Sequence, residues 1–286
     1  MFEQPSESRL ALSRELEARI RQEIQHSGGW IDFERYMEMA MFQPGLGYYA
    51  VNQDVFGSAG DYVTAPGLGE LFSACLASQV AGILRDPAFR KGEAGEEALP
   101  NVLEFGAGNG DLAANLLQEL DRRDALPECY CILETAAAMR QRQRERIGAL
   151  PRRLADRVHW IEALPESIHG VILANEVLDA MPFRRFRIRS DGAAKLLGVA
   201  ATPEGFQWAE SDCPAELERS VQSLGLPAGY ESEWNRQVPA WVRSVGGRLE
   251  QGVMLLVDYG YDRSTYFHPD RRMGTMHCHY RHQVHD

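Results

Sequence analysis

The chain of 286 residues lacks several features that would assign it at once to a class of protein. Its longest apolar stretches, such as residues 252–257, fall far short of the about 20 residues that a membrane-spanning helix needs. It has no run of basic residues, and 41 acidic against 30 basic side chains give a formal net charge of −11. These features argue against membrane insertion and against general binding of nucleic acids or anionic membranes, but they leave a cationic substrate open.

Cysteine is scarce as well. The five cysteines are an odd number and form no Cys-x-x-Cys pair, which is typical of a reducing compartment rather than of a disulfide framework. The first residues contain several glutamates, and they show neither the apolar core of a signal peptide nor the acid-poor composition of a transit peptide. We therefore expect a cytoplasmic protein of a bacterial cell.

Residue types that bind zinc gather near the end of the chain. They are His277, Cys278, His279, His282 and His285. Their spacing differs from the C-x₂-C…H-x₃-H arrangement of a structural zinc site. We therefore predict no metal site.

The first hundred residues predict helices and a long turn-rich loop. Apolar residues recur every four positions between Leu12 and Ile24, the pattern of an amphipathic helix, and Asp32 is placed to cap a second one. Glycines, prolines and aromatic residues dominate 43–69, and another helix is expected over 68–84. Residues 86–100 have the composition of a linker.

From residue 101 onward, short apolar runs alternate with helical patterns. Helices are expected over 111–120 and from Ala136 to about Ile147. The five expected strands cover residues 101–105, 129–133, 158–161, 170–174 and 252–257. This order predicts an α/β fold with a doubly wound, mostly parallel sheet that helices cover on both faces.

The alternation breaks between the fourth and fifth strands. Three short antiparallel strands are expected there, at 186–189, 195–200 and 206–209. A helix over 233–245 is expected to be interrupted near Pro239. These elements predict a β-rich insertion over about 183–250.

A glycine loop, Glu104-Phe-Gly106-Ala-Gly108-Asn-Gly110, follows the first of the five strands. A dinucleotide fingerprint would need a third glycine or an alanine at position 111, where this chain has Asp111, whose charge would face a pyrophosphate. No P-loop motif occurs either. Glu104 suits a ligand with an ammonium group, and Glu134, after the next strand, can accept from two ribose hydroxyls. S-adenosylmethionine has both groups and no phosphate, so it fits better than NAD; a glycine-rich turn without a ligand is the alternative.

Four segments of the chain together match one pattern. They are residues 47–49, 56–66 (FGSAGDYVTAP), the glycine loop 104–110 and 174–182 (ANEVLDAMP). The chain from about Ile31 onward thereby resembles the MidA-type family of S-adenosylmethionine-dependent methyltransferases. Mitochondrial members of that family are complex I assembly factors that methylate a protein arginine.

The resemblance implies a class I, Rossmann-like methyltransferase fold and roles for individual residues. It implies that residues 1–100 pack on the cofactor cleft and that 101–286 form the core with its insertion. The cofactor-binding residues it implies are Glu104, Gly106, Gly108, Gly110, Glu134, Asp61 and Thr64. Asn175, Glu176 and Asp179 are expected to border the transferred methyl group. The usual sheet of the family has seven strands, so we also expect C-terminal strands to be missing from these 286 residues.

The carboxylates of Glu176 and Asp179 suit an arginine acceptor, because a guanidinium pairs with carboxylates and loses a proton around methyl transfer. Without the resemblance, Glu176 would be a solvated turn residue, Asp179 a turn cap and Thr64 a plain helix cap. The resemblance implies a protein substrate, such as a subunit of a respiratory complex. A small-molecule methyltransferase and a cofactor-binding assembly factor without turnover are the alternatives.

Overall fold

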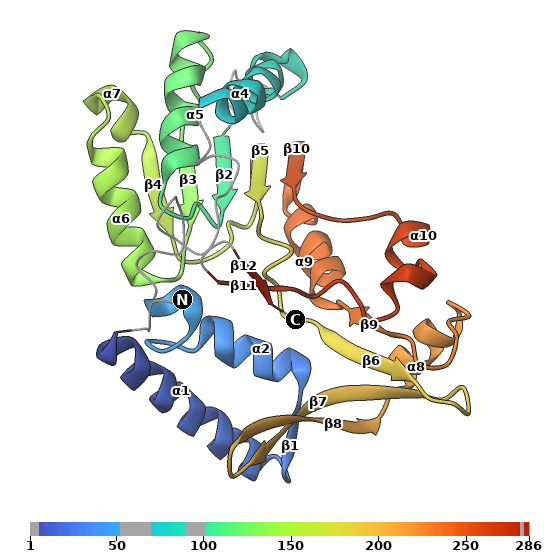
Figure 1. Ribbon diagram of the computed structural model, residues 1–286. Helices are drawn as coiled ribbons and strands as arrows, with labels where there is room; N and C mark the ends of the chain where they lie inside the picture. Colours follow the sequence, from blue (N-terminus) through green and yellow to red (C-terminus); the bar gives the residue numbers. More distant parts are fainter. Residues whose placement is uncertain (1–5, 52–69, 90–100, 281–282, 286) are drawn as a thin grey trace.

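The computed structural model describes residues 6–51, 70–89, 101–280 and 283–285, and Figure 1 shows their arrangement. Asp61 and Thr64 lie outside the described residues. In Figure 1 a central sheet with its helices lies above a second sheet, which packs with two N-terminal helices. No helix within the described ranges is long and apolar enough to cross a membrane.

The central sheet has five strands, and all its neighbouring pairs are parallel. Its strands are β2 (Asn101–Phe105), β3 (Tyr130–Leu133), β4 (Val158–Ile161), β5 (Ile168–Asn175) and β10 (Leu249–Val257). Their order is β10-β5-β2-β3-β4, so the chain builds outward from β2 in one direction and then returns to build in the other. The expected parallel sheet is confirmed. The reversal lies between β2 and β5, which is where open parallel sheets bind ligands.

Helices cover both faces of this sheet, as the doubly wound prediction requires. The helices of this part are α4 (Glu70–Arg85), α5 (Asp111–Arg122), α6 (Ala137–Gly148), α7 (Arg152–Ala155) and α9 (Gln237–Gly246). On one face, apolar residues of α4 to α7 pack with Val102 and Val171 of the strands. On the other face, Val245 and Trp241 of α9 pack against Leu103. Alternate strand residues thus serve two separate cores, because successive side chains point to opposite faces.

The second sheet is antiparallel throughout. Its strands are β1 (Trp30–Asp32), β6 (Arg184–Ile188), β7 (Ala194–Thr202), β8 (Gly205–Asp212) and β9 (Glu231–Trp234). The three strands expected in the insertion are confirmed as β6, β7 and β8. The sequence analysis did not predict strands β1 and β9 or helix α8 (Ala215–Gln222).

The helix expected over 233–245 is confirmed from Gln237 onward, but its expected start and its interruption near Pro239 were wrong. Residues Glu231–Trp234 form β9, and α9 begins only at Gln237. Pro239 therefore lies in the first turn of α9, where a backbone N–H has no partner within the helix and its loss interrupts nothing.

The N-terminal helices join the insertion. They are α1 (Glu7–His26) and α2 (Phe33–Phe42), and the short α3 (Tyr48–Val51) follows. Asp32 caps α2 as expected, since its carboxylate accepts from the backbone N–H of Arg35 at 2.9 Å. Ile20, Ile24 and Phe33 share an apolar core with Val199 of β7.

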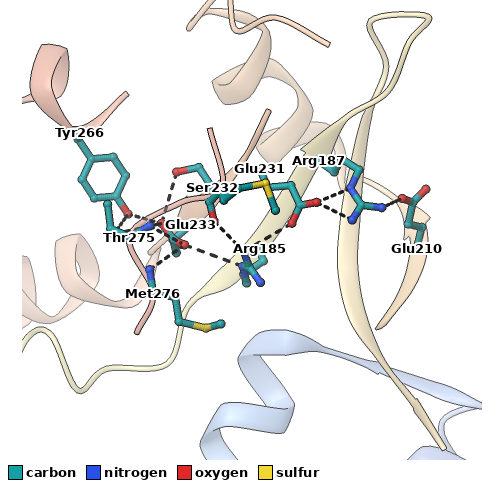
Figure 2. Close-up of polar contacts among 10 residues, drawn as sticks. Arg185, Arg187, Glu210, Glu231, Ser232, Glu233, Tyr266, Thr275 and Met276 are labelled. Atoms are coloured by element: carbon teal, nitrogen blue, oxygen red, sulfur yellow. Dashed lines mark hydrogen bonds and ion pairs between the residues drawn. The ribbon is translucent and has the colours of Figure 1, made fainter. Parts of the chain in front are cut away.

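The end of the described chain is held to the insertion by buried polar contacts. Its elements are α10 (Arg263–Tyr266), a 3₁₀ turn at Pro269–Arg271 and the two-stranded pair β11 (Cys278–Tyr280) and β12 (Gln283–His285). Another 3₁₀ turn, Pro87–Phe89, follows α4. Figure 2 shows the Glu233 carboxylate of β9 accepting from the backbone N–H groups of Thr275 and Met276 and from the hydroxyl of Tyr266. The neighbouring Glu231 pairs with Arg185 and Arg187.

Candidate functional site

The glycine loop turns sharply after β2, at the carboxyl end of the central sheet. Gly106, Gly108 and Gly110 have φ angles of +60°, +53° and +88°, all in the left-handed region that favours glycine. A Cβ on Gly106 would lie 2.8 Å from a methyl carbon of Val177, and one on Gly110 would lie 3.2 Å from the Cα of Gln143. The loop therefore packs between the segment after β5 and helix α6, and this packing leaves little room for a side chain at Gly106 or Gly110.

Glu104 lies one residue before the end of β2 and is only 1% exposed. The Tyr130 hydroxyl of the neighbouring strand donates to its carboxylate at 2.7 Å. Burial raises the pKa of Glu104 to about 7, against the opposing effect of this hydrogen bond. A bound ammonium group would favour the ionised form of this carboxylate.

Glu134 directly follows β3, beside the glycine loop, because Phe105 of β2 is in register with Leu133 of β3. Its Oε1 accepts from the backbone N–H of Ala136 at 2.9 Å, and its Oε2 accepts from the Gln143 side chain at 3.1 Å. Each oxygen of this carboxylate, which is predicted to bind ribose, thus accepts a hydrogen bond from the protein.

Gln143 is a site residue that the sequence did not reveal. It is completely buried, and its Nε2 donates to the carbonyl oxygen of Gly108 at 2.9 Å as well as to Glu134. Its Oε1 accepts from the indole N–H of Trp160 at 2.9 Å. Helix α6 is rich in arginine, yet Met139, Gln143 and Ile147 are buried at four-residue spacing. That spacing was the available signal, with a single polar residue on the buried face.

The segment after β5 brings the expected acceptor residues together. The side-chain oxygen of Asn175 is buried without a hydrogen-bond partner among the described residues. Glu176 has a φ of +50°, which is unusual for a residue other than glycine, and its N–H donates to the carbonyl oxygen of Val257 at 2.9 Å.

Asp258, which follows β10, is a second residue that the sequence analysis did not single out. Its Oδ2 accepts from the backbone N–H groups of Val177 at 3.1 Å and Leu178 at 2.7 Å. It therefore holds the turn that carries Glu176 and Asp179. The contact joins residues 80 positions apart, so no local pattern could indicate it.

Asp179 completes a group of three carboxylates at this edge. Its side chain retains solvent-exposed surface, yet partial desolvation, followed by the charges of Asp258 and Glu176, raises its pKa to about 6. A carboxylate with this pKa is mostly ionised at neutral pH and can still accept a proton.

These side chains fit an adenosyl amino-acid cofactor rather than a phosphate ligand. Glu104 and Glu134 are acceptors for an ammonium group and for ribose hydroxyls, and the Asn175 oxygen, which has no partner among the described residues, can accept another N–H or O–H. An anionic ligand would be repelled by the carboxylates of Glu104 and Glu134. Within the described ranges, no group of His, Cys, Asp and Glu is arranged to hold a metal ion.

The comparison with protein families agrees with this chemistry. A family model described as "Putative S-adenosyl-L-methionine-dependent methyltransferase" matches residues 76–286. The chain belongs to this family. The expected resemblance to these methyltransferases is thereby confirmed.

Solved structures of the same fold come from Burkholderia thailandensis. One, in complex with S-adenosyl-homocysteine, is 38% identical with a TM-score of 0.91 and covers 100% of this chain and 72% of that chain. Another, a native structure, is 38% identical with a TM-score of 0.87 and covers 100% of this chain and 71% of that chain. These matches confirm the methyltransferase fold.

The curated relatives are more distant and longer. The mitochondrial protein arginine methyltransferase NDUFAF7 homolog of Drosophila melanogaster is 26% identical over 96% of this chain and 64% of its own length. The mitochondrial protein arginine methyltransferase NDUFAF7 of Danio rerio is 25% identical over 82% of this chain and 59% of its own length. The chain thus spans about three-fifths of the length of these relatives.

Proposed function

We propose that this protein binds S-adenosylmethionine and transfers its methyl group to a protein side chain, namely arginine. The observation that carries the proposal is the pair of carboxylates, Glu104 and Glu134, at the ends of adjacent strands around a loop of three left-handed glycines. The S-adenosyl-homocysteine complex of the 38% identical relative supports the choice of cofactor. The curated relatives, named protein arginine methyltransferases, support the acceptor.

The cofactor residues have distinct roles in this proposal. Glu104 pairs with the ammonium group, and Glu134 accepts from the ribose hydroxyls. The backbone of the loop at Gly106, Gly108 and Gly110 lines the cofactor, while Asp61 and Thr64 approach it from the N-terminal part, as the family resemblance implies.

When bound, S-adenosylmethionine supplies an electrophilic methyl group on a positively charged sulfur. Glu176 and Asp179 pair with the acceptor guanidinium and orient one nitrogen in line with the methyl–sulfur bond. The Asn175 oxygen accepts a further N–H at this edge. Asp179, with a pKa of about 6, takes up the proton that the nitrogen loses when the new carbon–nitrogen bond forms and the carbon–sulfur bond breaks.

Radiolabelled methyl transfer into a cell lysate tests the proposal. We expect label in protein, recovered as methylarginine after hydrolysis. If the label were found in small molecules or in another amino acid, the acceptor would not be arginine. Binding of S-adenosyl-homocysteine without any transfer would favour an assembly factor that does not turn over.

Two matched variants separate binding from chemistry. Glu176→Gln keeps the side-chain shape, so cofactor affinity should stay unchanged while the transfer rate falls by about 100-fold. Glu134→Gln should instead weaken cofactor binding, with a smaller effect on the rate at saturation. Full transfer by Glu176→Gln under saturating cofactor would remove Glu176 from the proposed acceptor site.

A further inference from the structure

One side chain, Gln143, connects three parts of the cofactor edge. Its amide group reaches the glycine loop at Gly108, the carboxylate of Glu134 after β3 and the indole of Trp160 in β4. A primary amide has two N–H donors and one oxygen, and the contacts use both donors and the oxygen. A fully buried amide with both donors and its oxygen hydrogen-bonded is held in one orientation.

The chemistry of its partners fixes which end of the amide faces which group. The Trp160 indole N–H can only donate, so it requires the amide oxygen. The Gly108 carbonyl oxygen and the Glu134 carboxylate can only accept, so they require the amide nitrogen. A reversed amide would place like groups against each other at all three contacts.

The backbone around Gln143 is held just as firmly. The close approach of Gly110 to the Cα of Gln143 leaves little space between α6 and the loop, since a Cβ there would come within 3.2 Å. One turn further along α6, Arg146 pairs with Asp111 at 2.6 Å and donates to Asn115 at 3.1 Å, both in α5. Helix α6 thus contacts the glycine loop through Gln143 and the start of α5 through Arg146.

Glu134 receives its orientation from these contacts. The N–H of Ala136 occupies one carboxylate oxygen and the amide of Gln143 the other. A carboxylate has about four acceptor positions, so positions remain on both oxygens for two ribose hydroxyls. Without Gln143 the carboxylate could rotate about its side-chain bonds, and the loop carbonyl would lose its donor.

We propose that Gln143 is a positioning residue of the cofactor site, which aligns the Glu134 carboxylate with the ribose hydroxyls and sets its separation from the glycine loop. This inference rests on the proposed ribose role of Glu134. A positioning residue should change the affinity for ligands that carry the ribose hydroxyls. A residue that only packs α6 would change the affinity for all ligands equally.

Calorimetry with two ligands tests the inference: S-adenosyl-homocysteine and its analogue without the two ribose hydroxyls. The wild type should prefer S-adenosyl-homocysteine by about tenfold or more, because the hydroxyls donate to a charged group. Gln143→Leu should reduce this preference to near unity by weakening only the natural ligand. Gln141→Leu is the matched control, because Gln141 is exposed on the same helix and donates only to Glu145 among the described contacts; it should preserve the preference.

Gln143→Glu keeps the test decisive if the leucine variant unfolds. The new side chain has the same shape and can still accept from Trp160, but it places a second carboxylate against Glu134. A proton shared between the two carboxylates would relieve their repulsion, so the affinity deficit relative to wild type should be larger at about pH 8 than at about pH 6.

Three results would overturn the inference. The first is equal weakening of both ligands by Gln143→Leu, which would show a purely structural role. The second is a pH-independent deficit in Gln143→Glu. The third is full ligand preference in Glu134→Gln, which would remove the ribose role of Glu134 itself. None of these measurements depends on methyl transfer, so a failure of the proposed arginine acceptor would be seen separately.

Discussion

At the scale of single residues, the carboxylates at the end of the central sheet occupy two different environments. Glu104 is buried beneath the glycine loop with one hydroxyl donor, whereas Asp179 retains exposed surface beside two other acids. Desolvation is the main cause of both raised pKa values; the Tyr130 hydrogen bond opposes it at Glu104, whereas the charges of Asp258 and Glu176 add to it at Asp179. The same residue type is thereby suited to binding a cation in one place and to accepting a proton in another.

The pKa of about 7 predicts that cofactor affinity depends on pH. Below pH 7 Glu104 is largely protonated and must lose its proton to pair with an ammonium group, so affinity should fall as pH decreases and level off above it. Titration calorimetry across this range should also detect proton release. Glu104→Gln should abolish the dependence, and Tyr130→Phe should move its midpoint upward, because the hydroxyl lowers the pKa of Glu104. A pH-independent affinity in the wild type would contradict the role given to Glu104.

Asp258 predicts a shift in the pH profile of methyl transfer. Its negative charge raises the pKa of Asp179, so Asp258→Asn should lower that pKa and move the acidic limb of the rate profile to lower pH. The amide oxygen can still accept from Val177 and Leu178, which preserves the turn. An acidic limb that stays in place would show that another group takes up the proton.

At the scale of helices and strands, the sequence predicted the elements that have a regular apolar pattern. All five parallel strands were found, since each is an apolar run next to a helical pattern. Strand β9 was missed because its four residues, Glu-Ser-Glu-Trp, form no apolar run, and β1 was missed because it has only three residues and exists by pairing with the distant β7. Gln143 and Asp258 were missed for the same physical reason: their partners come from other elements of the fold.

The glycine loop predicts a substitution that separates backbone strain from steric contact. Gly106→Ala should lower the free energy of unfolding by about 1–3 kcal/mol, because φ is +60° and the new methyl group would meet Val177. Gly28→Ala is the control for strain alone, since Gly28 has a φ of +84° and open space around it. Chemical denaturation should show a larger loss of unfolding free energy for Gly106→Ala than for Gly28→Ala. Adding Val177→Ala to Gly106→Ala should remove the excess loss. Equal losses for the two alanine variants would mean that the contact with Val177 is easily relieved.

At the scale of the whole molecule, two layers with separate cores are joined through buried charges as well as apolar contacts. Glu34 of α2 is 6% exposed, and its carboxylate accepts from Arg184 at 3.0 Å, Arg236 at 3.1 Å and Gln237 at 2.8 Å. These partners lie in β6 and at the start of α9. A single carboxylate therefore connects the N-terminal helices with the insertion and with a helix that covers the central sheet.

Removal of this carboxylate should loosen the connection between the layers. Glu34→Ala leaves Arg184 and Arg236 without this partner and should lower the free energy of unfolding by about 3 kcal/mol. Glu38→Ala, which removes an exposed ion pair with Arg35 on the same helix, should cost less than about 1 kcal/mol. Limited proteolysis should then cut α1 and α2 faster in Glu34→Ala alone. Similar cleavage of both variants would assign the connection to the apolar contacts instead.

The pairing of β1 with β7 also has a consequence for synthesis on the ribosome. Ile31 pairs with Val199, so β1 leaves the exit tunnel long before its partner has been made. At about 5–20 residues per second, the 168 residues from Asp32 to Val199 take roughly 8–34 seconds to translate. During that time the apolar face of Ile20, Ile24 and Phe33 has no sheet to cover it. We therefore expect the nascent N-terminal helices to be a binding site for a chaperone during this interval.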